Sequence, residues 1–296
     1  MDFDAAVIGG SFAGMSAALQ LARARRRVAV FDSGLRRNRF AATSHGFLAQ
    51  DGRAPEAIVA DARAQLAAYA TVRWFDGAVT AASGSADAFQ LQTATATATH
   101  QARRIVLATG VADALPDIPG LAERWGRSVF HCPYCHGYEL QQGRIAVIAT
   151  SAVSLHQAQL LPEWGSVTFF LQGALSLGEE QARMLAARGV KVETTLVAGI
   201  VDHARIVLAD GRSESFDGVF TASRTAPASP LATQLGCEHE EGLLGPFVNT
   251  DAMKATSVPG VFACGDVARA AGNVALAVGD GALAGTAVHA SLVFHA

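Results

Sequence analysis

The sequence predicts an α/β protein made of two doubly wound, three-layer domains, with the second domain inserted into the first. Three observations support this fold class. Short apolar runs end in glycine or an acid, Ala- and Leu-rich segments with helical spacing follow them, and a Pro- and Gly-rich stretch at 112–120 separates two such series. The chain has 296 residues, of which 50% are hydrophobic, so it is long enough for two ordinary domains.

The first series opens with a strand, a glycine-rich turn, a helix, a second strand and an acid over residues 4–32. Gly9, Ser11 and Gly14 occupy the three positions of G-x-G-x-x-G, with serine in place of the middle glycine. Such a turn lets a pyrophosphate approach the N-terminus of the following helix, and an acid about 20 residues later binds ribose hydroxyls. Asp32 has the required spacing. This order of elements predicts a Rossmann-like dinucleotide site.

The rest of the first series is less distinctive. Residues 55–70 are expected to form a helix, and residues 89–110 alternate in a way that predicts a hairpin leading into a buried strand. The Thr-Ala repeat within this stretch suits a half-exposed strand, and we assign it no function.

The second series predicts another Rossmann-like domain. Its expected elements are strand 144–149, helix 152–163, strand 167–172, helix 178–188 and strand 190–195. From about residue 245 the chain offers another strand that ends in Gly-Asp and then a helix to the C-terminus, which return to the first domain. We therefore place the first domain at 1–113 and 244–296, and the inserted domain at 114–243.

Charge and hydropathy argue against two classes of partner. The formal net charge is −3, which gives no electrostatic reason to expect nucleic acid or an anionic membrane surface. We expect no apolar run of the ~18–20 residues that a membrane helix needs. The N-terminus lacks a basic region followed by a cleavage site, so we expect a cytoplasmic protein.

The stretch "HCPYCHGYE" at 131–139 holds two cysteines two residues apart, with a histidine on either side. Alone, it fits a redox disulfide, half of a zinc site or a covalent haem attachment. Zinc needs four ligands, yet a second C-x-x-C is missing, and Cys237 and Cys264 lie far apart in the sequence. Haem attachment occurs after export, for which the sequence carries no signal. We therefore expect a redox pair and no metal.

Four motifs in order resemble those of the low-molecular-weight thioredoxin reductase family. "VIGGSFAGMSAALQLARARRRVAVFD", "IVLATG" and "GVFACGD" are similar to its FAD-binding segments, and "HCPYCHGYE" sits where it carries its redox disulfide. The resemblance covers nearly the whole chain and implies FAD and a homodimer. The resemblance would place Gly9, Ser11, Gly14 and Asp32 at the adenosine end of the FAD, and Thr109 and Gly110 near its middle. It would place Gly265 and Asp266 at the ribityl chain and pyrophosphate. Asn273 would lie near the flavin ring, and His45 would lie in a loop beside the flavin.

The same resemblance implies roles within the redox motif. Cys135 would face the flavin, and Cys132 would exchange with the substrate. Most thioredoxin reductases carry an acid after the second cysteine, where this chain has His136, and a histidine can accept and donate protons near neutral pH. The motif is also similar to that of dithiol oxidases that close disulfides in small natural products, and to that of family flavoproteins that use no nicotinamide.

The second nucleotide turn departs from the reductase pattern. In the reductases the inserted domain binds NADPH through another glycine-rich turn, and arginines after its second strand hold the 2′-phosphate. Here Ala149, Ser151 and Ser154 stand at the three key positions, and no arginine or lysine follows the second strand before Arg183. Each added Cβ narrows the space through which a pyrophosphate reaches the backbone. We therefore expect FAD but not NADP as a cofactor.

These observations predict an FAD-dependent thiol-disulfide oxidoreductase that moves electrons between a Cys132–Cys135 disulfide and flavin without NADPH. Its substrate would be a small dithiol or a thioredoxin-like protein, and its electron partner would be oxygen or a redox protein. Three alternatives stay open: an NADPH-dependent thioredoxin reductase with a divergent turn, a dithiol oxidase that uses oxygen, and a two-flavin electron-transfer protein.

Overall fold

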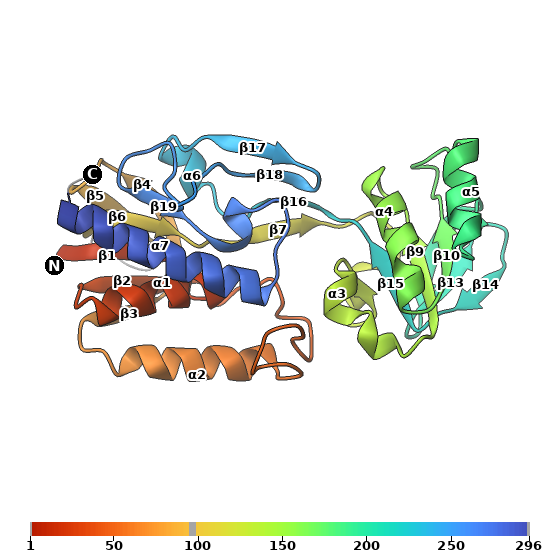
Figure 1. Cartoon of the computed structure of the whole chain (residues 1–296), viewed down its shortest axis with the longest axis horizontal. Helices are drawn as coiled ribbons and strands as arrows, with labels where there is room; N and C mark the ends of the chain where they lie inside the picture. Colours follow the sequence, from red (N-terminus) through yellow and green to blue (C-terminus); the bar gives the residue numbers. More distant parts are fainter. Residues whose placement is uncertain (1, 95–98, 295–296) are drawn as a thin grey trace. The chain divides into compact units, whose positions relative to one another are not determined.

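The computed structural model describes residues 2–94 and 99–294, so part of the Thr-Ala repeat lies outside the described residues. The chain forms two compact units (Figure 1). Unit 1 comprises residues 1–39, 47–112 and 225–296, and unit 2 comprises residues 40–46 and 113–224. The chain passes between the units at 39/40 and 46/47, and again in β7 (Val111–Ala114) and in β16 (Arg224–Pro227).

Unit 1 contains a mainly parallel sheet in the order β3-β2-β1-β6-β5-β4, and β19 pairs in parallel with β6 beyond the residues that β5 contacts. The strands are β1 (Asp2–Ile8), β2 (Val28–Asp32), β3 (Val72–Asp76), β4 (Val79–Ser83), β5 (Phe89–Thr93), β6 (His100–Leu107) and β19 (Val261–Ala263). Strand β5 pairs antiparallel with β6, which is the hairpin expected within residues 89–110, and it also pairs antiparallel with β4, which the sequence did not predict.

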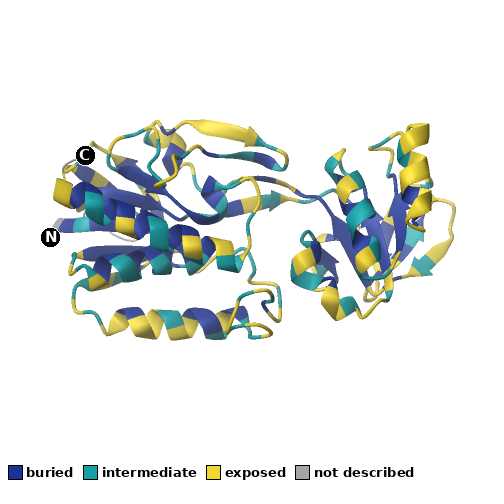
Figure 2. Cartoon of the chain, in the orientation of Figure 1, coloured by how far each residue is buried: buried dark blue, intermediate teal, exposed yellow. Residues whose placement is uncertain are grey.

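Helices and loops cover both faces of this sheet. The helical segments are α1 (Phe12–Arg23), α2 (Pro55–Ala67), α6 (Leu231–Gln234), η4 (Gly265–Ala268) and α7 (Val274–Phe294), and the hairpin β17 (His239–Gly242) and β18 (Gly245–Val248) completes the unit. Phe31 and Leu231 belong to the core on one face, while Val30 and Leu21 belong to the core on the other. Figure 2 shows the buried strands between more exposed outer helix faces. The predicted doubly wound α/β class is confirmed.

Helix α7 packs closely on α1. A Cβ on Gly281 would lie 2.0 Å from the Ala13 carbonyl oxygen, and Ser16 Oγ donates to the Val278 carbonyl at 2.7 Å. At 21 residues with a mean hydropathy of 1.3, α7 is long and apolar enough to cross a membrane, so the expectation that no run reaches this limit is wrong. Core helices of soluble proteins meet the same criterion, and Ala277, Ala284, Val288 and Leu292 of α7 belong to the core of unit 1.

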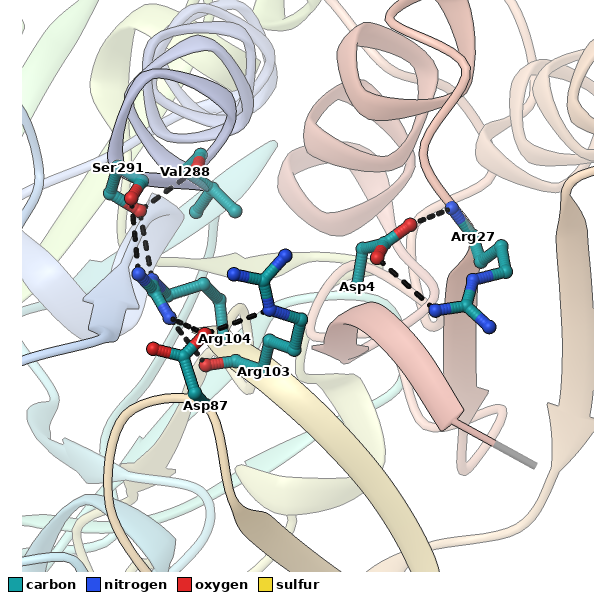
Figure 3. Close-up of polar contacts among 7 residues, drawn as sticks. All are labelled: Asp4, Arg27, Asp87, Arg103, Arg104, Val288 and Ser291. Carbon is teal, nitrogen blue, oxygen red and sulfur yellow. Dashed lines mark hydrogen bonds and ion pairs between the residues drawn. The ribbon is translucent and has the colours of Figure 1, made fainter. Parts of the chain in front are cut away.

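A buried arginine fixes the C-terminal turn of α7 (Figure 3). Arg104 on β6 is only 4% exposed and donates to Ser291 Oγ and to the Ser291 carbonyl, both at 3.0 Å. Its Nη1 also contacts Asp87 Oδ1 at 3.0 Å, and Arg103 Nε donates to the same oxygen at 2.8 Å. These two guanidinium groups lower the pKa of Asp87, chiefly through the hydrogen bond from Arg103. The cluster ties β6 to both a loop and the last helix.

Unit 2 contains a parallel sheet in the order β11-β10-β9-β15-β8, which is a second doubly wound domain. Its strands are β8 (Val129–Phe130), β9 (Arg144–Ile148), β10 (Ser166–Phe170), β11 (Lys191–Glu193) and β15 (Gly218–Thr221). An antiparallel sheet of β12 (Val197–Val201), β13 (Arg205–Leu208) and β14 (Ser213–Ser215) accompanies it. The helical segments are η1 (Ala122–Arg124), α3 (Pro133–His136), η2 (Tyr138–Leu140), α4 (Val153–Leu160), η3 (Leu161–Glu163) and α5 (Glu179–Ala187).

Two segments belong to a different unit from the one expected from the sequence. Residues 225–243 pack in unit 1, where Leu231 shares a core with Phe89. Residues 40–46 pack in unit 2, where a Cβ on Gly126 would lie 2.8 Å from the Cβ of Phe40. Both differences arise from packing between segments that are far apart in the sequence.

Candidate active site

The first glycine-rich turn needs its glycines for steric reasons. Gly9 has a φ of +118°, and a Cβ there would lie 2.1 Å from the Ala108 carbonyl oxygen. A Cβ on Gly14 would lie 1.8 Å from the Gly9 carbonyl oxygen. Ser11 precedes α1 in an extended conformation, and its side chain does not cap the helix. The amide groups of the first turn of α1 therefore have no side-chain partner from Ser11.

The acid predicted to bind ribose lies against this turn. Because β1 and β2 run parallel, with Ile8 beside Phe31, the two strands end at the same edge of the sheet. A Cβ on Gly10 would lie 2.5 Å from the Cβ of Asp32, which shows how closely the turn and the acid approach. Asp32 Oδ1 accepts the Gly34 amide hydrogen at 2.9 Å.

The C-terminal motif joins the same region of unit 1. Gly265 has a φ of +75°, and a Cβ there would lie 2.8 Å from Ala13 Cβ at the start of α1. Asp266 Oδ2 accepts from Arg37 Nη1 at 2.9 Å. Asn273 precedes α7, and its Oδ1 accepts the Leu276 amide hydrogen at 2.9 Å.

The structure brings the middle motif to the same turn. The Thr109 amide nitrogen would lie 3.3 Å from a Cβ on Gly9, and Gly110 has a φ of +67°. The backbone cradle, the uncapped start of α1 and the nearby acid together suit a dinucleotide such as FAD. His45, in contrast, belongs to unit 2. The individual contacts of all these residues with FAD stay predictions.

Cys132 and Cys135 form a disulfide in unit 2. Cys132 is the extended residue before α3, and Pro133 occupies the first turn, where its missing N–H costs no hydrogen bond. The Cys135 amide donates to the Cys132 carbonyl at 3.2 Å. Both cysteines are partly exposed, as a pair that exchanges with a substrate requires.

His136 differs from an ordinary solvent-exposed histidine. Its ring stacks on Phe130, with ring centres 4.2 Å apart and planes inclined by 19°. Burial, followed by the nearby positive charge of His45, lowers the pKa of His136 from 6.5 to about 4. The imidazole is therefore neutral at pH 7 while the disulfide is intact.

A cavity of about 750 Å³ in unit 2 reaches His136. Phe130 and Glu139 also line it. His45 Nδ1 lies 3.3 Å from Glu139 Oε1, and His45 Nε2 lies 3.0 Å from Thr43 Oγ1. No local signal in the sequence connects Glu139 to His45, which lies in a distant segment.

The sequence did not predict two further contacts of residues 131–139, called the redox segment below. Gln157 Nε2 on α4 donates to the His131 carbonyl at 2.7 Å. The Trp164 ring packs edge-on against Tyr134, at 5.4 Å between ring centres, and a Cβ on Gly137 would lie 2.8 Å from it. The glycine after the C-x-x-C-H motif is the only sequence signal that hints at this close approach.

The second nucleotide turn is closed by side chains. Ser154 is fully buried, and its Oγ accepts the Thr150 amide hydrogen at 3.0 Å. Thr150 Oγ1 in turn donates to the Ala222 carbonyl at 2.6 Å. A backbone donor that a phosphate could use is therefore occupied.

The end of the second strand of unit 2 is similarly occupied. Gln172 accepts the Val197 amide hydrogen at 2.7 Å and donates to the Val197 carbonyl at 3.3 Å. Glu179 and Glu180 lie in the first turn of α5. Glu179 and Glu180 therefore place negative charge at the start of α5.

The remaining cysteines are buried free thiols. Burial raises the pKa of Cys237, and it raises the pKa of Cys264 to about 12. Both are therefore unreactive thiols at neutral pH. Within the described residues, no group of three or more His, Cys, Asp or Glu side chains could hold a metal ion.

Comparison with known proteins identifies the family. The pyridine nucleotide-disulphide oxidoreductase family matches residues 3–281. The chain belongs to this family.

Relatives and solved structures agree with this assignment. The chain is 33% identical over 307 residues to the thioredoxin reductase sirT of Leptosphaeria maculans, covering 97% of this chain and 93% of that one. It is 35% identical over 297 residues to the thioredoxin reductase tcpT of Claviceps purpurea, covering 95% and 92%. The crystal structure of an oxidoreductase from Agrobacterium tumefaciens is 54% identical and superposes with a TM-score of 0.97 over 99% of both chains. The protein is therefore a thioredoxin reductase-like flavin disulfide oxidoreductase, and the predicted resemblance is confirmed.

Proposed function

We propose that this protein oxidises dithiols to disulfides and takes no electrons from NADPH. FAD, when bound, accepts an electron pair from the reduced cysteine pair and returns it to an external acceptor, which we take to be oxygen. The overall reaction is then dithiol plus oxygen to disulfide plus hydrogen peroxide. Unit 1 would hold FAD through the residues assigned above other than His45, and unit 2 would present the redox pair.

The observation that carries this proposal is the hydrogen bond from the Thr150 amide to Ser154 Oγ. Nicotinamide nucleotides need open backbone donors after the first strand of their domain. Here a buried side chain uses one of these donors, and the acids of α5 repel a phosphate. Without a nicotinamide donor, the dithiol itself is the simplest source of electrons.

The chemistry at the cysteine pair is thiol-disulfide exchange. A substrate thiolate attacks Cys132 Sγ, the disulfide bond breaks, and Cys135 leaves as a thiolate. The second substrate thiolate then attacks the substrate sulfur of the mixed disulfide, which closes the substrate disulfide and releases Cys132. The substrate loses two electrons to the pair and two protons, of which His136 accepts one and solvent the other.

The environment of His136 supports its role as the proton acceptor. A neutral imidazole stacked on Phe130 has a free lone pair at pH 7. When the adjacent Cys135 becomes a thiolate, the new negative charge favours the protonated imidazole. The proton therefore transfers to His136 as the disulfide opens and leaves it as the disulfide re-forms.

Anaerobic mixing of the FAD-loaded protein with dithiothreitol, NADPH or NADH tests the proposal. We expect dithiothreitol to bleach the flavin absorbance and both nicotinamides to leave it unchanged. Admission of air should then restore the absorbance and release hydrogen peroxide. Rapid bleaching by either nicotinamide would refute the proposal.

An NADPH-dependent thioredoxin reductase is the second candidate, because sirT and tcpT carry the name thioredoxin reductase. Its substrate would be a thioredoxin-like protein rather than a small dithiol. The same experiment separates the two functions. A homodimer and a cytoplasmic location are proposed on the family resemblance, and light scattering of the purified protein tests the former.

A further inference from the structure

The segment formed by α4 and η3 contacts the redox motif at two separate places. Gln157, on the middle of α4, reaches the backbone just before Cys132. Trp164, directly after η3, reaches the residues between and after the cysteines. In a nicotinamide-binding domain the helix at this position receives the pyrophosphate. Here its turn is closed, and its side chains hold the redox segment instead.

The orientation of the Gln157 amide is determined by its surroundings. Gln157 is buried, and its Nε2 donates to the His131 carbonyl at 2.7 Å. Its Oε1 is also buried and has no partner within the described part of the chain. Reversing the amide would place Oε1 against the carbonyl oxygen, where two acceptors repel each other. The hydrogen bond to the His131 carbonyl is therefore the polar contact that the buried Gln157 side chain makes with the redox segment.

The second contact constrains the other end of the motif. Trp164 packs edge-on against Tyr134, and the Gly137 position has no room for a Cβ because the indole occupies that space. The Trp164 amide is itself fixed by a 2.9 Å hydrogen bond to the Leu161 carbonyl of η3. A rigid aromatic ring thus holds the segment from Tyr134 to Gly137 against unit 2.

We propose that Gln157 and Trp164 are positioning residues that hold the redox segment in the conformation in which Cys132 and Cys135 are bonded. Both contacts are present in the disulfide form, and the proposal requires that they be weaker in the dithiol form, so that they favour the disulfide. Their loss lets the reduced segment relax, which lowers the effective concentration of one thiol near the other. This inference rests on the proposed exchange at the pair, but not on the electron acceptor or on the absence of NADPH use.

Equilibration of the FAD-loaded protein with glutathione under anaerobic conditions tests the inference. The reaction converts the protein disulfide and two glutathione thiols into the protein dithiol and glutathione disulfide. Alkylation and mass spectrometry of the peptide that carries both cysteines then measure the oxidised fraction. We expect Gln157→Met to lower the equilibrium constant for disulfide formation by about tenfold, equivalent to about 30 mV for a two-electron couple.

Gln159→Met is the matched control, because it makes the same change on the same helix at a side chain that contacts Met184 instead. We expect its equilibrium constant to stay within about twofold of the unchanged protein. With dithiothreitol as substrate, Gln157→Met should lower kcat by about tenfold and change KM by less than about twofold, because positioning acts on the reacting pair. A loss of stability alone would not move the glutathione equilibrium.

Two further variants keep the inference testable if Gln157→Met fails to fold. Gln157→Asn retains an amide that is too short for the His131 carbonyl, and Trp164→Leu removes the ring that contacts Tyr134. Both should shift the glutathione equilibrium in the same direction. Folded variants at both positions with an unchanged equilibrium constant would overturn the inference. Such a result would leave the proposed function intact, because the flavin-bleaching experiment decides that separately.

Discussion

The Thr150 amide donates to Ser154 Oγ at 3.0 Å, so the turn after β9 is held by one of its own side chains. Thr150 adds a second bond, to the Ala222 carbonyl on the neighbouring strand segment. A turn of this kind keeps the Rossmann-like backbone without the open donors that a pyrophosphate needs. The proposed lack of NADPH use therefore requires no change in the Rossmann-like backbone of unit 2.

Ser154→Ala should lower the free energy of unfolding by about 1–2 kcal/mol, because it removes a buried acceptor and leaves the Thr150 amide without its partner. It should not create NADPH affinity, since the Cβ at position 154 remains. Urea unfolding measures the first effect, and NADPH fluorescence titration measures the second. Ser151→Ala, at an exposed position in the turn before α4, is the control, and an equal loss of stability there would contradict the argument.

His136→Gln should reduce dithiol turnover by about 10²-fold, the usual effect of removing a positioned proton acceptor. FAD content should be unchanged. Stopped-flow measurement of flavin reduction by dithiothreitol isolates this step from reoxidation. His156→Gln, an exposed position on α4, is the control, and similar rates for the two variants would rule out the assigned role.

The low pKa of His136 also predicts how stability depends on pH. The unfolded histidine binds a proton near pH 6.5, whereas the folded one does so only near pH 4. Between these values the unfolded state binds more protons, so stability falls as the pH is lowered through this window. His136→Gln should remove a contribution on the order of 2 kcal/mol between pH 7 and about pH 4.5. Urea midpoints of the oxidised protein at both pH values measure the difference, and identical pH dependence in the variant would contradict the burial of His136.

Asp32→Asn should weaken FAD binding by about tenfold or more, because a charged acceptor for ribose hydroxyls becomes a neutral one. The dissociation constant follows from the recovery of flavin fluorescence on dilution. Asp76→Asn provides a close control, since Asp76 ends β3 directly beside Asp32 and pairs with Arg63. If both variants lost FAD equally, the ribose role of Asp32 would be wrong.

Cys135→Ser should retain FAD and lose dithiol turnover, because no disulfide remains for exchange. Turnover is measured as oxygen consumption with dithiothreitol. Cys237→Ala removes a buried thiol outside the redox motif and should retain activity. Unchanged turnover in Cys135→Ser would show that the dithiol reduces the flavin directly.

Much of the fold follows from sequence periodicity. The expected strand at 144–149 and helix at 178–188 correspond to β9 and α5 with ends differing by one residue. The helix expected at 152–163 is divided into α4 and η3, because Pro162 cannot supply the amide that would continue the α-helix. The domain boundaries depend on contacts between distant segments, and no local pattern encodes such contacts.

The candidate site, like the fold, could be predicted from the sequence only in part. Gly9, Asp32 and the cysteine pair are visible as motifs, because their chemistry depends on local spacing. Gln157 and Trp164 are not, since each contacts a segment more than twenty residues away. The sequence alone shows that position 154 is not glycine. That the Ser154 hydroxyl accepts the Thr150 amide hydrogen was evident only from the structure.

The packing of α7 against α1 has a consequence for biosynthesis. The last strand of the unit 1 sheet and its final helix are encoded after residue 260, whereas every strand of unit 2 has been translated by residue 224. The inserted unit can therefore fold on the ribosome while the surrounding unit still lacks β19 and α7. Capture of the flavin is then expected to be a late event that completes maturation of the chain, and protease resistance of stalled nascent chains, appearing first in residues 113–224, would reveal this order.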